Sequence, residues 1–181
     1  MAQRKETVDE AFAGDIVGLP DTGNFKIGDT LTSGEILHFK GLPSFSPEMF
    51  KYIENADPMK QKQLDKGVKQ LMDEGVAQLF VSQLNGRKII GTVGQLQFEV
   101  IQYRLEHEYN ALCRWEPIQL YKACWIESDD AAQIAEFKRR KAQYMAFDKA
   151  GRDVFLADSA YILQLAQNDY PHIRFHFTSE F

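Results

Sequence analysis

The chain has 181 residues, of which 44% are hydrophobic and 26% are charged, and its formal net charge is −5. This composition excludes a disordered or fibrous chain, and the negative charge excludes a protein coated with nucleic acid, although local basic patches can still contact RNA. No apolar run approaches the roughly 18–20 residues that span a bilayer, so we expect a cytoplasmic protein with no membrane contact.

The two cysteines, Cys113 and Cys124, lie among apolar residues. In a cytosolic protein such residues are typically reduced and buried. A disulfide between them is the alternative.

The first 42 residues have the pattern of β structure. A short apolar strand is expected at residues 15–19, turn residues follow at 20–24, and a second strand is expected at 25–31. Two strands are too few to close a barrel. We therefore interpret residues 1–42 as the end of a β-barrel domain and residues 43–181 as a separate α+β domain.

The second domain opens with an expected strand at residues 48–55. A helix follows, because Asp57 suits the N-cap, Pro58 suits the first helical position and Gly75 suits the left-handed residue after the end. Its lysines, which include Lys62 and Lys66, are interpreted as the solvated face of the helix.

A hairpin and a second helix come next. Strands are expected at residues 77–84 and 87–93, and Asn85-Gly86 between them favours a type I′ turn. Gly94 opens a helix at residues 95–109, and a strand is expected at 112–118. The order from residue 48 is βαββαβ, which indicates a ferredoxin-like unit.

The last third is interpreted as a C-terminal αβ extension. We expect a strand at residues 120–126, a helix capped by Ser128 with Met145 on its buried side, and a further strand, helix and strand. No full-length internal repeat is visible in the residues. The predicted fold class is therefore α+β: a partial barrel, a ferredoxin-like βαββαβ unit and this extension.

Motifs for catalysis or nucleotide binding are absent from the sequence. The phosphate-binding pattern G-x-x-x-x-G-K-[ST] does not occur, and the glycine turn at residues 91–94 is interpreted as a tight strand-to-helix connection. His172 and His176 have a metal-binding spacing only on a helix, whereas on the expected strand they lie about 13 Å apart. Asp129 and Asp130 are explained by helix capping. We expect neither a catalytic residue, nor a cofactor, nor a metal in this chain.

One basic cluster stands out. Lys138, Arg139, Arg140 and Lys141 are consecutive and close to the expected end of a helix. Cations are favourable at that end of the helix dipole, so a solvated helix end explains them. Contact with RNA phosphates is the alternative.

Several separate segments resemble one family in the same order. Residues 11–19 and 27–31 resemble the end of the second domain of translational GTPases, and residues 91–100 resemble the strand-turn-helix of their third domain. Elongation factor G reads Gly-Glu-Leu-His-Leu-Glu at that turn, whereas this chain reads Gly-Gln-Leu-Gln-Phe-Glu, which is similar to peptide chain release factor 3. Residues 57–64 and 163–171 are similar to that factor as well.

The resemblance implies a parent protein with a G domain that binds GTP or GDP with Mg²⁺. Such a parent drives class I release factors off the ribosome after peptide release. The implied partners are the ribosome, through rRNA and ribosomal protein, the G domain itself and, indirectly, the class I release factors. The alternatives are a free-standing ferredoxin-like RNA-binding module and the equivalent region of an elongation factor G-like protein.

Overall fold

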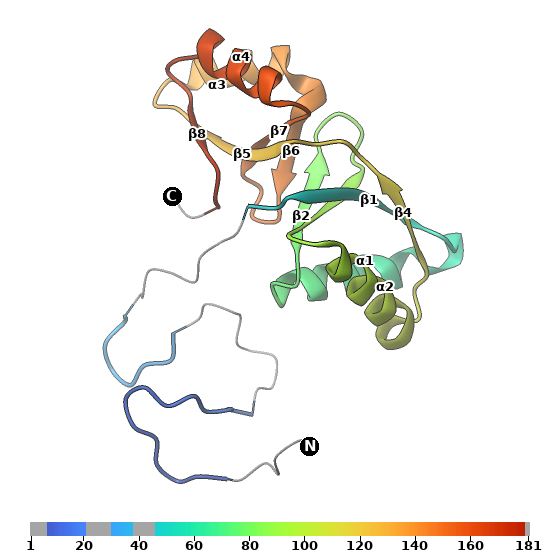
Figure 1. The fold of residues 1–181 in the computed structure, drawn as a ribbon, viewed down its shortest axis with the longest axis vertical. Coiled ribbons are helices and arrows are strands. Elements are labelled where there is room, and N and C mark those ends of the chain that lie inside the picture. The colour runs from blue at the N-terminus through green and yellow to red at the C-terminus, as the bar shows by residue number, and fades with distance from the viewer. Residues whose placement is uncertain (1–6, 21–29, 38–45, 180–181) are drawn as a thin grey trace.

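The computed structural model describes residues 7–20, 30–37 and 46–179 (Figure 1). Helices and strands occupy the last of these ranges. In chain order they are β1 (Met49–Asn55), η1 (Pro58–Lys60), α1 (Gln61–Asp73), β2 (Gln78–Ser82), β3 (Lys88–Thr92), α2 (Gln95–Tyr109), β4 (Cys113–Pro117), β5 (Lys122–Glu127), α3 (Ala131–Arg140), η2 (Ala142–Tyr144), β6 (Met145–Asp148), β7 (Asp153–Ala157), α4 (Ala160–Asp169) and β8 (Arg174–His176).

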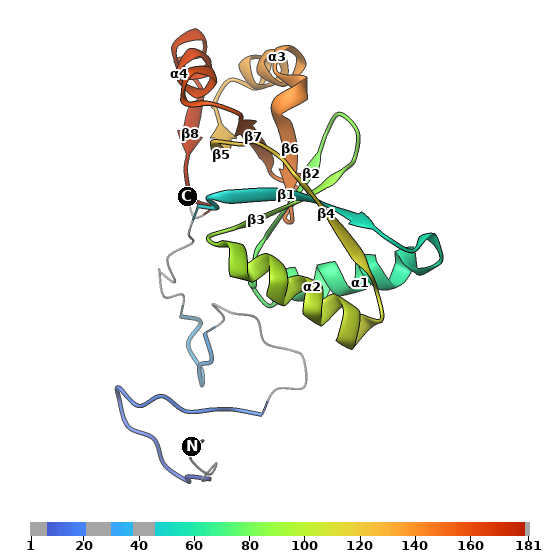
Figure 2. The ribbon, with the colours of Figure 1, turned by 45° about the vertical axis from the view of Figure 1, so that its right-hand side comes forward.

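All eight strands form one sheet in the order β4-β1-β3-β2-β6-β7-β5-β8, and each neighbouring pair is antiparallel. At the junction of β2 and β6, Val81 lies opposite Phe147 and Ser82 lies opposite Ala146. Opposite residues in an antiparallel pair point to the same face. Both helix pairs therefore cover the same face of the sheet, α1 and α2 over one half and α3 and α4 over the other (Figure 2).

The strand order is palindromic. Elements β1 to β4 with α1 and α2 have the order βαββαβ, and their strands lie in the order 4-1-3-2. Elements β5 to β8 with α3 and α4 repeat that element order, and their strands lie in the order 2-3-1-4, which is the same arrangement read from the opposite edge. The protein thus contains two halves of equal topology, joined through the second strand of each.

The sheet curls, so that the face without helices is enclosed and packs against itself. The Phe80 ring lies 6.1 Å from that of Phe50 on β1 and 6.0 Å from that of Trp125 on β5. In a flat sheet β2 and β5 would be three strand spacings apart, or about 14 Å. The curl brings both halves into a shared core, whose buried members are Phe50, Phe80, Ile89, Ala123, Trp125, Ala146, Val154 and Leu156.

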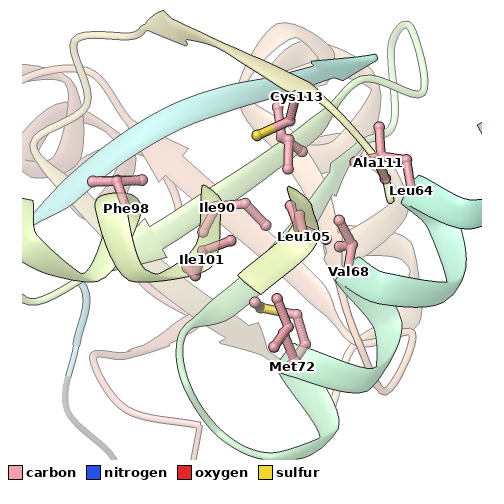
Figure 3. Close-up of a cluster of buried hydrophobic side chains, with 11 residues drawn as sticks. Leu64, Val68, Met72, Ile90, Phe98, Ile101, Leu105, Ala111 and Cys113 are labelled. Atoms are coloured by element: carbon pink, nitrogen blue, oxygen red, sulfur yellow. The ribbon is translucent and has the colours of Figure 1, made fainter. Parts of the chain in front are cut away.

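Each half also has its own core beneath its helices. In the first half α1 and α2 pack on β3 and the start of β4 (Figure 3), and the buried members are Ile53, Leu64, Val68, Leu71, Met72, Ile90, Phe98, Ile101, Leu105, Ala111 and Cys113. In the second half Phe137 of α3 makes edge-on contacts with Phe155 and Tyr170 at 5.3 and 5.0 Å. The described part of the protein therefore has three apolar cores, and the shared core belongs to both halves.

The expected helix starts in the first half are largely as predicted. The Asp57 carboxylate accepts from the Met59 N–H at 3.0 Å, although the first turn is the 3₁₀ helix η1 before α1 begins. Gly75 has a φ of 73°, the left-handed geometry expected after the helix. Helix α2 begins after Gly94, as its sequence predicts.

One strand of the C-terminal αβ extension, β6, was missed in the sequence analysis. Ile134, Phe137 and Met145 have helical spacing, so Met145 was placed on the preceding helix. The structure ends α3 at Arg140, and Met145 begins β6. Neither glycine nor proline marks this break; the chain leaves helical geometry at Lys141, with φ −107° and ψ 23°, and passes through η2 before β6.

Two local expectations are corrected as well. The turn at Asn85-Gly86 is not type I′, because Gly86 has a φ of 70° while Asn85 has no positive φ. The N-cap of α3 is Asp130, which accepts from Ala132 and Gln133, whereas the Ser128 hydroxyl donates to the His172 carbonyl. The shift occurs because a carboxylate two residues closer to the helix competes for the same N–H groups.

The strand expected at residues 15–19 is not formed. Ile16 is fully exposed and Leu19 is 60% exposed. A strand needs a partner for its N–H and C=O groups, and within the described ranges no other strand adjoins this segment. Most of the second expected strand, at residues 25–31, lies outside the described residues, so the partial barrel remains a prediction.

Membrane-spanning helices were sought in the part of the chain that the structure describes. None of its helices combines the length and the apolar character that a bilayer crossing requires.

Candidate nucleic-acid interface

The basic cluster lies where the sequence predicted, in the last turn of α3 and just beyond it. Phe137 anchors this turn in the core, and the Lys141 N–H donates to the Phe137 carbonyl at 2.8 Å. Lys138, Arg139 and Arg140 are the cations of the last turn. They lie at the negative end of the helix dipole, which stabilises the helix whether or not a partner is present.

Ion pairs divide the cluster. Lys138 lies 2.7 Å from Asp153 on β7 and 5.6 Å from the centre of the Phe147 ring, and Arg140 lies 2.8 Å from Glu136 on its own helix. Arg139 and Lys141 have no ion pair within the described residues. The cluster therefore offers two unpaired cations and one weakly paired arginine to a phosphate, and the role of Lys138 is mainly structural.

The glycine turn before α2 holds its N–H groups in internal hydrogen bonds. The Gln97 side-chain oxygen accepts from Val93 and Gly94, at 2.7 and 3.2 Å. These are the groups that a phosphate at this helix N-terminus would use. Gly91 packs so closely that a Cβ there would lie 2.8 Å from Pro47 and 3.0 Å from Phe80. Gly91 of β3 is therefore explained by the close packing of Pro47 and Phe80 against this strand.

Of the acidic and histidine candidates, Asp129 and His176 belong to one ion-pair group at the end of β5. Arg174 pairs with Asp129 at 3.0 Å and with Glu127 at 3.4 Å, and His176 contacts Glu127 at 3.1 Å. Hydrogen bonds from Arg174 lower the pKa of both carboxyl groups. Asp129 thus joins β5 to β8 and does not cap α3, which leaves capping to Asp130. His172 contributes only its carbonyl, to Ser128.

Both cysteines are buried thiols, as predicted. Cys113 lies in the core of the first half and Cys124 in that of the second. Burial raises the pKa of Cys113 to about 11 and that of Cys124 to about 12. A buried thiol of high pKa is a poor nucleophile.

Comparison with known protein families assigns most of the chain. Residues 39–167 match the family described as class II release factor RF3, C-terminal domain. The chain belongs to this family. Residues 1–34 match the family described as elongation factor G domain 2, ahead of the release-factor match. The chain is thus a region of a translation factor of the GTPase class, and the matched domains are non-catalytic ones.

Proposed function

We propose that this chain is the ribosome-binding, non-catalytic part of a class II release factor, the GTPase that stimulates departure of class I release factors from the ribosome. The family match over residues 39–167 carries the proposal. The order of the two matched domains, with the second domain of a translational GTPase first, agrees with it. GTP or GDP and Mg²⁺ would be held by a G domain of the parent protein, in the cytoplasm.

The architecture suits a positioning role. A shared core ties the two halves, and Phe80 contacts aromatic rings of both. A body of this kind keeps surfaces on the two helix pairs at a fixed separation. We propose that it orients the parent factor on the ribosome, that each half is ferredoxin-like, and that the domain boundary lies near residue 42.

Part of the ribosome contact is assigned to the end of α3. Arg139, Arg140 and Lys141 are the members of the basic cluster available to rRNA phosphates, because Lys138 is held by Asp153. Replacing Arg139 and Lys141 by glutamate should weaken ribosome binding and flatten its salt dependence, since each lost phosphate contact lowers the slope. Unchanged binding and slope would identify the cluster as a solvated helix end.

A free-standing RNA-binding module is disfavoured by the sheet itself. Such modules stack bases on aromatic side chains of an open sheet face. Here Phe50 and Phe80 are buried in the shared core, and β3 carries no aromatic residue. The equivalent region of an elongation factor G-like protein stays a second candidate, because residues 1–34 match that factor.

A domain exchange separates the two candidates. Residues 39–181 would replace the corresponding region of a full-length class II release factor and, in a second chimera, that of an elongation factor G. Stimulated departure of class I release factors in the first chimera, with no translocation by the second, is the expected result. Translocation by the second chimera together with an inactive first one would refute the proposal.

A further inference from the structure

Helix α1 presents an outer face of lysine and glutamine. Lys62, Lys66 and Lys69 are exposed and follow one another at intervals of four and three residues, so they lie on one side of the helix. At 1.5 Å per residue the row is about 10 Å long. Gln63 and Gln70 are the exposed neighbours on this face. We call the three lysines the α1 lysine row.

The two acids of α1 are paired with lysines of other elements. Asp65 pairs with Lys88 of β3 at 2.5 Å, and Asp73 pairs with Lys149 of the β6–β7 turn. The three lysines of the row have no ion pair among the residues that the structure describes. In a chain of net charge −5, three unpaired cations on one helix face form a local concentration of positive charge.

The row also contradicts the electrostatics of the helix. Lys62 lies in the first turn of α1, which contains no acid, and the N-cap residue Lys60 makes no capping hydrogen bond with its side chain. The positive end of a helix dipole disfavours cations. The preceding turn η1 is capped by Asp57, as α3 is by Asp130 and α4 by Ser159, so the departure from the rule lies in the lysine at the start of α1. A position that departs from a local rule without a structural gain is a candidate functional site.

We propose that the α1 lysine row binds RNA phosphates, an inference that rests on the proposed ribosome-binding function and names a second contact surface for it. Lysine is a point charge suited to phosphate oxygens. Protein interfaces are depleted of lysine at their cores and use aromatic or arginine anchors, and no such residue lies on this face of α1. The row lies on the opposite helix pair from the α3 cluster (Figure 2), so the two surfaces can bind independently.

The test compares three forms of the chain on protein-free ribosomal RNA. One is the natural sequence, the second carries Lys62→Gln, Lys66→Gln and Lys69→Gln, and the third carries arginine at the same positions. Affinity is measured between about 50 and 200 mM salt. The glutamine form should lose about 2 from the slope of log K against log salt, on the order of 0.7 for each lysine. The arginine form should keep the natural slope.

Thermal unfolding shows whether the glutamine form is folded, since these side chains have no ion pair to lose. Equal slopes for the natural and glutamine forms, or no RNA binding by the natural form, would overturn the inference. So would a defect that appears on whole ribosomes but not on protein-free RNA, because the partner would then be a ribosomal protein. The proposed function fails separately, if the natural chain does not bind whole ribosomes.

Discussion

Asp148, at the end of β6, links β5 to the β6–β7 turn through one carboxylate. One oxygen accepts from the Trp125 indole N–H at 2.9 Å and from Arg152 Nε at 2.8 Å, and the other accepts from the backbone N–H groups of Ala150 and Arg152. The side chain is only 8% exposed. Burial alone would raise its pKa, but the hydrogen bonds from Trp125 and Arg152 favour the charged form more, so the pKa is lowered.

Replacing Asp148 with Asn should therefore destabilise the protein by about 1–3 kcal/mol at pH 7, the cost of unsatisfied buried donors. The effect depends on pH. The folded-state pKa is below the unfolded value of about 3.9, so the carboxylate stabilises the fold above that value and its contribution is lost as the pH falls through the folded pKa. Urea unfolding at pH 7, 4 and 3 should show the gap between natural and variant proteins narrowing with acid. A constant gap would contradict this account.

Single residues show where sequence reasoning succeeds and where it stops. Asp57 starts a helical segment as predicted, because capping depends on the residue and its immediate neighbours. The basic cluster was also predicted from local sequence, because its four residues are consecutive. The pairing of Lys138 with Asp153 could not be predicted, since it joins a helix to a strand that only the tertiary fold brings together.

At the scale of elements, Gly67 sets the distance between α1 and α2. A Cβ at this position would lie 2.7 Å from Leu105 Cδ2 and 2.8 Å from Tyr109 Cγ. The Tyr109 contact is at the root of the ring, so rotation of the ring about χ2 cannot relieve it. The two helices can approach this closely only because position 67 has no side chain.

We expect Gly67→Ala to destabilise the protein by about 1–2 kcal/mol, because overpacking costs about 1–3 kcal/mol and exceeds the helix-propensity gain of about 1 kcal/mol. Chemical denaturation measures the difference. Lys66→Ala, one residue away on the exposed side, is the control and should stay within about 0.5 kcal/mol of the natural chain. A more stable Gly67→Ala protein would show that propensity wins and that the helices can separate at little cost.

The elements were predicted best where the spacing of apolar residues agrees with a residue that starts or ends an element. Helix α2 has the predicted bounds, since Gly94 opens it and a turn follows Tyr109. Strand β6 was missed because its four residues continue the apolar spacing of α3 without a break signal. This one short strand concealed the second βαββαβ half, and with it the internal symmetry of the fold.

At the scale of the whole molecule, residues 46–179 form a single packing unit, although their topology is double. Phe80 of the first half and Trp125 of the second are both buried in the shared core. Sequence periodicity predicts which strand faces are apolar but not that a sheet of eight strands will curl and cover its own face. The position of the shared core therefore had to come from the structure.

The shared core predicts that the halves unfold together. Each half contains one of the two tryptophans, the half-buried Trp115 and the buried Trp125, so Trp125→Phe and Trp115→Phe each leave one fluorescent reporter. Leu71→Ala is then added to both. Leu71 is fully buried in the core of the first half alone, and this truncation costs about 2–5 kcal/mol.

In a cooperative unit the added Leu71→Ala lowers the free energy of unfolding equally for both reporters, and fluorescence and circular dichroism give the same midpoint. Independent halves would behave differently, because Trp115 would report the loss while Trp125 in the second half would keep its original midpoint. Leu163→Ala, in the core of the second half, is the reciprocal control. It should shift the Trp115 midpoint although Leu163 belongs to the other half.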